Sequence, residues 1–307
     1  MNKIIALFLA GKKNKKHISN ISPAFQKTIF LLFLYVAFSC NVIAAEKNHT
    51  AKIKPLNLGL IPHLSSNLMI KKYSNLINYL EEVLHRPVTI NTAPNFKTYV
   101  QRSSEGKFDL YMTAPHMAVY HEKHDQHIRL AKFSNNLHAV IAVTKDSPYK
   151  NITDLKGKTI TAPDALAANT INGELTLINN GLDIEKEAAI NYTTSNNNPL
   201  VLLSENKADA AITGLPGFKI VSRNSRLKQP LRILKTSEPI PHMMFMSPPR
   251  VSPADREAFK KALLNMPDNK TGNAFLSGLP FGHPVEVTDK DLQQLADMLK
   301  TLEQRLK

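Results

Sequence analysis

The chain contains no tryptophan, and aromatic residues make up only 7% of its 307 residues. Proteins that bind single-stranded nucleic acid need aromatic rings on which bases stack, so this scarcity argues against such a surface. Cysteine is also scarce, because Cys40 is the only one. A single thiol cannot form an internal disulfide, so the folded chain must be stabilised by its core. Hydrophobic residues account for 43% and charged residues for 21%, which is the balance of a globular protein.

Acidic residues are missing from the first 45 positions, which carry six lysines. An apolar run follows at 29–38, and small residues close the segment at Ala44 and Ala45. This order predicts a signal peptide over residues 1–44, cleaved after Ala44 or Ala45, and therefore a periplasmic protein. The run of roughly ten apolar residues is shorter than the about 20 of a membrane-spanning helix. An uncleaved membrane anchor, or lipidation at Cys40, is the alternative.

Removal of the signal peptide changes the meaning of the positive charge. The formal net charge falls from +14 to +8 when its six lysines are lost. The basic balance therefore belongs partly to the export signal, and we expect no nucleic-acid partner. The polar residues 45–55 are interpreted as a linker left by processing.

Two stretches about a hundred residues apart share the pattern Ser-Glu-x-Lys-x-Asp, at 104–109 and 204–209. The third position holds Gly106 in one copy and Asn206 in the other. Both residue types tolerate the left-handed conformation that ends many helices. An apolar run that ends in threonine follows each copy. Each copy therefore predicts a helix end, a tight turn and a short buried strand, and the repetition predicts two lobes of similar build.

Short apolar segments alternate with helical patterns along the rest of the chain, which predicts α/β lobes with largely parallel sheets. The strands are expected at 56–61, 88–90, 110–113, 128–133, 137–144, 159–162, 189–192, 210–213, 231–236 and 243–246. The helices are expected at 73–84, 96–105, 152–158, 168–180 and 199–204, and from residues 115, 253 and 288 onward.

Six short segments follow one another in a defined order. They are Gly-Leu-Ile-Pro at 59–62, Gly-Lys-Phe-Asp-Leu at 106–110, Ala-Pro-His at 114–116, Ile-Thr-Asp-Leu-Lys-Gly-Lys-Thr-Ile at 152–160, Lys-Ala-Asp-Ala-Ala at 207–211 and Pro-Ile-Pro-His at 239–242. Over roughly residues 56–284 this order resembles the phosphate, phosphite and phosphonate substrate-binding proteins of ABC transporters.

The resemblance implies a two-lobe type II periplasmic-binding-protein fold. Each lobe would be a mixed, mostly parallel sheet flanked by helices, and ligand would lie in the cleft between the lobes. Two crossing strands would join the lobes, near 137–144 and 231–236. Residues 56–142 and 237–307 would form the first lobe, and residues 143–236 the second.

The chain departs from the family pattern in its second lobe. Phosphonate binders of the family typically have a Ser-Thr-Ser run where this chain has alanine and leucine at 165–168, with Asn169 and Thr170 just beyond. The acidic residue that typically follows a later strand is replaced by the segment 213–216, which contains Gly214. The resemblance therefore supports the fold more strongly than a phosphonate ligand.

Four histidines are expected at strand ends that face the cleft, namely His63, His116, His138 and His242. Partly protonated, they could donate hydrogen bonds to an oxyanion. Neutral, and with Met243 nearby, the same four could hold a transition metal or a metal complex. A third interpretation is that several are unrelated histidines at element ends.

A polar loop before the helix at 199–204 adds further candidates, although its side chains could simply cap that helix. The predicted ligand-binding residues are His63, Tyr111, Thr113, His116, His138, Asn169, Thr170, Thr194, Ser195, Asn196, Gly214 and His242. A separate motif, His121-x-x-His124-x-x-His127, could form a surface metal site, but its hydrophilic context favours a solvated helix end.

The sequence therefore predicts a periplasmic solute-binding component of an ABC importer, monomeric and without cofactor. It would capture a small oxyanion or organophosphorus ligand by hinge closure and deliver it to a permease in the inner membrane. No nucleophile elbow, zinc-protease motif or phosphate loop is present, so no catalytic residue is predicted. The alternatives are a binding protein for a transition metal or metal complex, a ligand-sensing partner of a membrane receptor, and a metal hydrolase built on the cleft histidines.

Overall fold

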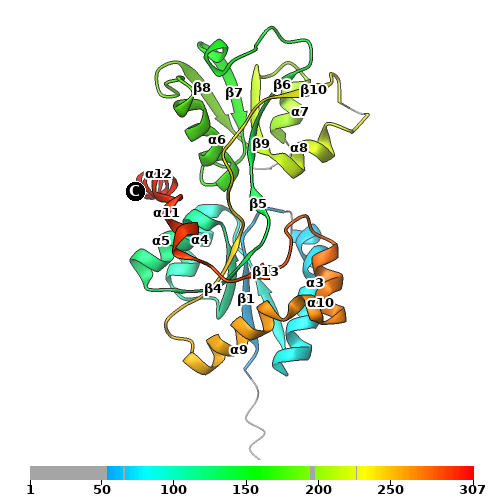
Figure 1. The fold of residues 1–307 in the computed structure, drawn as a ribbon, viewed down its shortest axis with the longest axis vertical. Helices are drawn as coiled ribbons and strands as arrows, with labels where there is room; N and C mark the ends of the chain where they lie inside the picture. The colour runs from blue at the N-terminus through cyan, green and yellow to red at the C-terminus, as the bar shows by residue number, and fades with distance from the viewer. Residues whose placement is uncertain (1–53, 65, 194–197, 226) are drawn as a thin grey trace, which may run out of the picture. The chain divides into compact units, whose positions relative to one another are not determined.

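The computed structural model describes residues 54–64, 66–193, 198–225 and 227–307. Within these residues, two larger sheets contain most of the strands (Figure 1). The six-stranded sheet has the order β13-β4-β12-β3-β1-β2, and the five-stranded sheet the order β10-β6-β9-β7-β8. We call the six-stranded sheet with its covering helices the first lobe, and the five-stranded sheet with its helices the second lobe.

The first lobe is a mixed sheet covered on both faces. Its strands are β1 (Leu56–Leu60), β2 (Val88–Asn91), β3 (Leu110–Thr113), β4 (Ile128–Phe133), β12 (Met244–Ser247) and β13 (Pro284–Val285). Its helices are α3 (Ser66–Leu84), α4 (Phe96–Ser104), α5 (Pro115–Asp125), α9 (Pro253–Leu264) and α10 (Lys270–Ser277), with the 3-10 helix η3 (Met266–Asp268). β1 is parallel to β2 and β3, whereas β12 is antiparallel to β3 and β4.

Helix α3 shows why the first sheet is covered so fully. Its apolar residues Met69, Tyr73, Leu76 and Leu80 recur every three or four positions and are all buried. In Figure 1, α3 and α10 lie together on one side of the sheet, and α4 and α5 on the other. All four residues of β3 are therefore buried, as expected for a strand with helices on both faces.

The second lobe repeats this plan with fewer elements. Its strands are β6 (Ala139–Thr144), β7 (Lys158–Ala162), β8 (Ala188–Tyr192), β9 (Ala210–Gly214) and β10 (Leu231–Thr236). Its helices are α6 (Ala168–Asn179), α7 (Asn198–Ser204) and α8 (Leu215–Val221), with the 3-10 helix η2 (Ile152–Leu155). Along β6, Ile141 and Val143 pack in one apolar cluster and Val140 and Ala142 in another. This alternation places one cluster on each face of the sheet.

The chain passes between the two sheets at a short antiparallel pair, β5 (Asn136–Leu137) with β11 (Ile240–Pro241). The predicted crossing segments, 137–144 and 231–236, mostly form β6 and β10, which pair within the second sheet. The crossing therefore lies at the ends of these segments. The apolar run of β6 is better buried in a sheet than exposed at a crossing.

The predicted repeat is confirmed at the level of the backbone. Gly106 has a φ angle of 65° and Asn206 one of 56°, both in the left-handed region. In each copy the lysine that follows donates its backbone N–H to a helical carbonyl five residues earlier, Arg102 or Leu202. The helix ends there and the chain turns into β3 or β9.

Two helices were not predicted, and the last one is divided. The sequence pattern gave no signal for α8 or α10. The helix expected from residue 288 onward consists of α11 (Asp289–Gln293) and α12 (Ala296–Leu306). Helix α12 contacts α5 of the first lobe and α6 of the second. No helix among the described residues is long and apolar enough to cross a membrane.

Candidate ligand-binding site

Three described helices that follow strands, α5, α6 and α8, lack a side-chain cap from the residue that precedes them. The residues before α5 and α6 are Ala114 and Ala167, whose side chains cannot accept a hydrogen bond. By contrast, Asn95, Ser252 and Asn269 cap α4, α9 and α10 with side-chain oxygens. The first backbone N–H groups of α5 and α6 therefore stay uncapped by side chains at the positive ends of the helix dipoles, an arrangement suited to an anion.

His116 connects these two N-termini. It is the second residue of α5 and is fully buried, and its Nε2 lies 3.0 Å from the carbonyl oxygen of Leu166, just before α6. Burial lowers the pKa of His116 from 6.5 to about 4; the bond to Leu166 opposes this shift, and the positive charge of Arg305 adds to it. His116 is therefore neutral at pH 7 and joins the first lobe to the second.

The start of α6 carries two further polar groups at this place. Asn169 Oδ1, Thr170 Oγ1 and His116 Nδ1 are buried, and none has a hydrogen-bond partner among the described residues. Buried polar atoms are normally paired, so each such atom calls for an explanation. Three of them within a few residues of one interlobe contact indicate a place built to receive a polar ligand.

Gly214 is brought to the same place from the end of β9. A Cβ atom at Gly214 would lie 2.6 Å from Asn169 Nδ2, which is closer than van der Waals contact allows. The glycine thus makes room for the Asn169 amide. The structure brings together four predicted residues, His116, Asn169, Thr170 and Gly214.

His63 and His242 form a separate pair inside the first lobe. His63 Nδ1 lies 2.9 Å from the Ile61 carbonyl oxygen, and Tyr73 Oη lies 3.3 Å from its Nε2. His242 Nδ1 accepts the backbone N–H of Met243 at 2.9 Å, and its ring packs against Phe281. Burial lowers the pKa of His242 to about 3, with His63 contributing, and burial also lowers the pKa of His63.

The remaining predicted residues have partners within the protein or fall outside the described residues. Tyr111 is buried, and its Oη lies 2.6 Å from His127 Nδ1. Thr113 Oγ1 donates to Met117 Sδ at 3.8 Å. His138, beside the crossing, has Nδ1 3.5 Å from the Ser237 carbonyl oxygen. Three further predictions, Thr194, Ser195 and Asn196, lie outside the described residues.

Comparison with known proteins identifies the family. Residues 58–292 match the family model described as "ABC transporter, phosphonate, periplasmic substrate-binding protein". The chain belongs to this family. It is the periplasmic substrate-binding component of a phosphonate-type ABC importer, as the resemblance predicted. No significant match was found among curated proteins.

Solved structures of phosphonate-binding proteins share the fold. PhnD1 from Prochlorococcus marinus, in complex with methylphosphonate, is 15% identical, with 81% of this chain and 98% of that chain covered and a TM-score of 0.71. A binding protein component of an ABC phosphonate transporter from Pseudomonas aeruginosa is 15% identical, with 82% and 96% covered and a TM-score of 0.68. The periplasmic aliphatic sulphonate-binding protein SsuA from Escherichia coli is 16% identical, with 82% and 93% covered and a TM-score of 0.57. The two-lobe α/β fold is thus confirmed.

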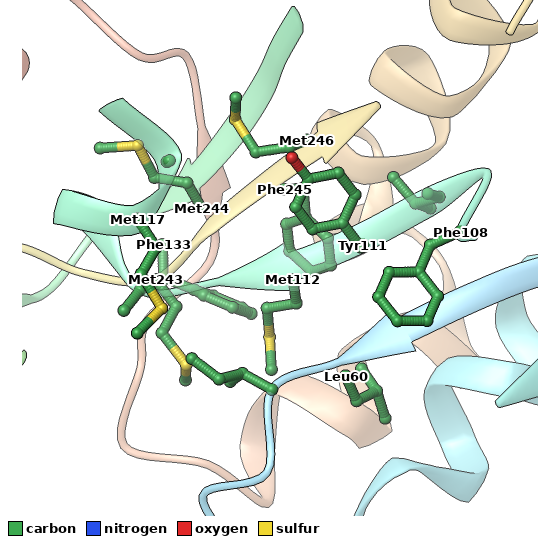
Figure 2. Packing of buried hydrophobic residues seen from close by; sticks show 14 of the residues in the cluster. Leu60, Phe108, Tyr111, Met112, Met117, Phe133, Met243, Met244, Phe245 and Met246 are labelled. Carbon is green, nitrogen blue, oxygen red and sulfur yellow. The ribbon is translucent and has the colours of Figure 1, made fainter. Parts of the chain in front are cut away.

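The family match supports the phosphonate-type interpretation over the metal-binding alternative. Among the described residues, no group of three or more His, Cys, Asp or Glu side chains could hold a metal ion. His116 and His138 bond to different carbonyl groups, while His63 and His242 pair elsewhere. Figure 2 shows Met243 packed among other buried apolar side chains of the first lobe, where it fills the core.

The His121-x-x-His124-x-x-His127 motif was predicted to be a solvated helix end. This prediction is wrong, because His121 and His127 are buried. The His121 and His127 rings stack with their centroids 5.4 Å apart, and the ring edge of Tyr111 packs against both. Adjacent strand residues face opposite sides, and Figure 2 shows the Tyr111 and Met112 side chains on opposite sides of β3. Burial lowers the pKa of both histidines, that of His127 to about 4. The left-handed residue Gln126, with φ 57°, turns the chain inward here, which helical spacing could not reveal.

Arg305 of α12 is a further interlobe contact that the sequence did not reveal. Its guanidinium donates to Glu174 Oε2 at 2.6 Å and to the Ala165 carbonyl oxygen. Burial raises the pKa of Glu174, and the charge of Arg305 opposes that shift. A cavity of about 730 Å³ lies between α6 and α12, and Glu174 and Arg305 are among the residues that line it. None of His116, Asn169, Thr170 and Gly214 lines this cavity.

Proposed function

We propose that the two lobes close on a small phosphonate or related oxyanion held between the N-termini of α5 and α6. The observation that carries this proposal is the set of three buried polar atoms on His116, Asn169 and Thr170 that have no hydrogen-bond partner among the residues the structure describes. The uncapped N–H groups of the two helices would bind the anionic oxygens. PhnD1, which shares the fold, was solved with methylphosphonate and supports the choice of ligand class.

The ligand-bound chain would then deliver its cargo to an inner-membrane permease, acting as a monomer in the periplasm after cleavage near Ala44. Lobe closure supplies the signal, because the permease can recognise a surface that exists only in the closed form. Binding and release suffice for this role, so we propose no catalytic step. The other described candidates would have a structural role around the ligand, since each has a hydrogen-bond partner within the protein. They are His63, Tyr111, Thr113, His138 and His242.

A thermal-shift panel of the processed chain tests the ligand class. Methylphosphonate, phosphite, phosphate and methanesulfonate are added separately, and at least one should raise Tm. A ligand at 100 times its Kd stabilises the fold by about 2.7 kcal/mol, which raises Tm by roughly 5–10 °C for a chain of this size. If no oxyanion shifts Tm at millimolar concentration, the proposal fails.

The variant T170V separates ligand binding from folding. Thr170 Oγ1 has no hydrogen-bond partner within the described part of the chain, so its removal should leave the stability of the free chain unchanged or slightly increased, while ligand affinity falls about tenfold. The matched control is T176V on the same helix, because Thr176 Oγ1 donates to the Asn172 carbonyl oxygen at 2.7 Å. T176V should change stability and leave affinity intact. If T170V leaves affinity unchanged and T176V lowers it, the Thr170 hydroxyl does not contact the ligand and the proposed position of the site is wrong.

A further inference from the structure

His116 faces the second lobe in one defined tautomer. The Leu166 carbonyl oxygen can only accept a hydrogen bond, so His116 Nε2 must carry the hydrogen of the 3.0 Å contact. The neutral ring has only one N–H, and Nδ1 therefore presents a lone pair. Nδ1 is buried and has no hydrogen-bond partner among the described residues. It is an acceptor that requires a donor.

This acceptor lies at the end of α5 that favours negative charge. His116 is the second residue of the helix, beside backbone N–H groups that no side chain caps. Those groups attract an anionic oxygen, whereas the Nδ1 lone pair repels an oxygen that carries no hydrogen. Both requirements are met when one oxygen of the anion is bare and a second carries a hydrogen atom.

We propose that His116 Nδ1 accepts a hydrogen bond from the P–OH group of a singly protonated phosphonate and thereby selects phosphonates over sulfonates. The proton stays on the ligand. This inference rests on the proposed function, and it assigns substrate selectivity to a residue of the first lobe. Asn169 Oδ1, the second unpartnered acceptor, would favour the same protonated form from the second lobe.

Phosphonates and sulfonates differ in whether one of their oxygens carries a proton near neutral pH, and His116 Nδ1 would detect this proton as a hydrogen-bond donor. Phosphate monoesters lose their second proton at about pH 6. The carbon substituent of an alkylphosphonate withdraws less electron density from phosphorus than the ester oxygen of a phosphate monoester does. The P–OH group of an alkylphosphonate therefore stays protonated to a higher pH. A sulfonate of the same shape carries no proton at these pH values. It would place a bare oxygen against a lone pair, and sites with unpaired buried polar groups discriminate by factors of 100 or more.

Calorimetric titration of the processed chain with methylphosphonate and methanesulfonate at pH 6.5 tests the inference. The wild type should bind methylphosphonate at least about 100-fold more tightly. In H116Q the glutamine amide can still donate to the Leu166 carbonyl oxygen but offers no acceptor at the Nδ1 position. The preference should therefore fall below about tenfold, mainly through weaker phosphonate binding. H124Q, at the exposed end of the same helix, should keep the wild-type preference.

Each other outcome removes a defined part of the account. If H116Q weakens both ligands equally, His116 only holds the lobes together and the inference is overturned. A wild type that binds both ligands equally also overturns it, while the proposed function survives. If neither ligand binds, the inference is overturned, and the proposed function falls as well when phosphite and phosphate also leave Tm unchanged. If an aminoalkylphosphonate alone binds, the hydrogen donor is an ammonium group and the P–OH assignment is wrong.

A measurement on the wild type avoids any folding defect of H116Q. Nitrogen-15 NMR of the chain with bound methylphosphonate should show the His116 ring with its hydrogen on Nε2 and Nδ1 as a hydrogen-bonded acceptor. A ring that carries a hydrogen on Nδ1 in the complex would contradict the inference, because Nδ1 would then donate to the ligand.

Discussion

In the first lobe, the Asp109 carboxylate accepts the backbone N–H of Asn57 at 2.8 Å, and its own N–H donates to the Asn57 carbonyl oxygen at 2.9 Å. In the second lobe, Asp209 makes the same pair of contacts with Thr159, at 2.9 and 2.8 Å. Each aspartate thus joins the turn after a helix to the adjacent parallel strand. The repeated pattern serves the same structural purpose in both lobes.

The side chains around this shared frame differ. From residue 54 onward, every histidine lies in residues 54–138 or 242–307, and none occurs between residues 139 and 241. At the interlobe contact the first lobe supplies the His116 imidazole, and the second supplies backbone, an amide and a hydroxyl. The two lobes therefore share the backbone contacts that join their strands, whereas the side chains that meet at the interlobe contact differ in chemistry.

The largest effect is expected from removal of the shared frame. D109A leaves the Asn57 N–H and part of Arg250 unpaired and should lower the free energy of unfolding by about 3 kcal/mol. D209A, which loses Thr159 N–H and Tyr149 Oη, should cost about 2 kcal/mol. Urea unfolding measures both, with the exposed D146A as the control. If either variant loses less than about 0.5 kcal/mol of unfolding free energy, the two aspartates do not serve the same structural purpose.

Acid should act selectively on the first lobe. Buried His127 has a pKa of about 4 against 6.5 unfolded, so the unfolded chain binds more protons between these values. The stability contributed by its neutral form is therefore fully present above pH 6.5 and is lost as pH falls toward 4. Between pH 7.5 and 5.0 this one group accounts for about 2 kcal/mol.

H127F tests this effect, because phenylalanine keeps the ring packing but cannot titrate. The loss of stability between pH 7.5 and 5.0, measured by urea unfolding, should shrink by about 2 kcal/mol. Hydrogen exchange at pH 5.0 should show wild-type amides losing protection in the first lobe more than in the second. An identical pH dependence in H127F, or equal loss in both lobes, would contradict this interpretation.

The smallest effect is expected at Gly214, where the second lobe makes room for Asn169. In G214A the added Cβ would lie 2.6 Å from Asn169 Nδ2 and displace the amide. Affinity for methylphosphonate should fall about tenfold, or about 1.4 kcal/mol. G278A is a matched control, because Gly278 has a similar φ of −82° and its added Cβ would meet its nearest atom at 3.4 Å. Equal affinities of the two variants would place the ligand away from Asn169.

Much of the frame could be predicted from sequence because it is local. The pattern around Gly106 and Asn206 predicted a left-handed turn and a buried strand, and apolar periodicity predicted most strands and helices. Helices α8 and α10 escaped because they are short and contain glycine and, in α8, Pro216, residues that usually indicate loops. Their helical form depends on packing against the sheets and on neighbouring helices.

The candidate site was predictable only in part. Strand ends and family position pointed to His116, Asn169, Thr170 and Gly214, but the same rule also selected His63 and His242, which bond inside the first lobe. Whether a histidine at a strand end faces the ligand depends on distant partners, and these are invisible in a single sequence. The Arg305 contact with Glu174 joins residues 131 positions apart and shows the same limit.

The central claim is that both lobes contact one ligand at the N-termini of α5 and α6. Residue-resolved hydrogen exchange with and without saturating methylphosphonate tests it most directly, because bound amides exchange more slowly. If both lobes contact the ligand, protection should increase at His116 and Met117 in the first lobe and at Asn169 and Thr170 in the second. Protection confined to one lobe, or to neither, would contradict it.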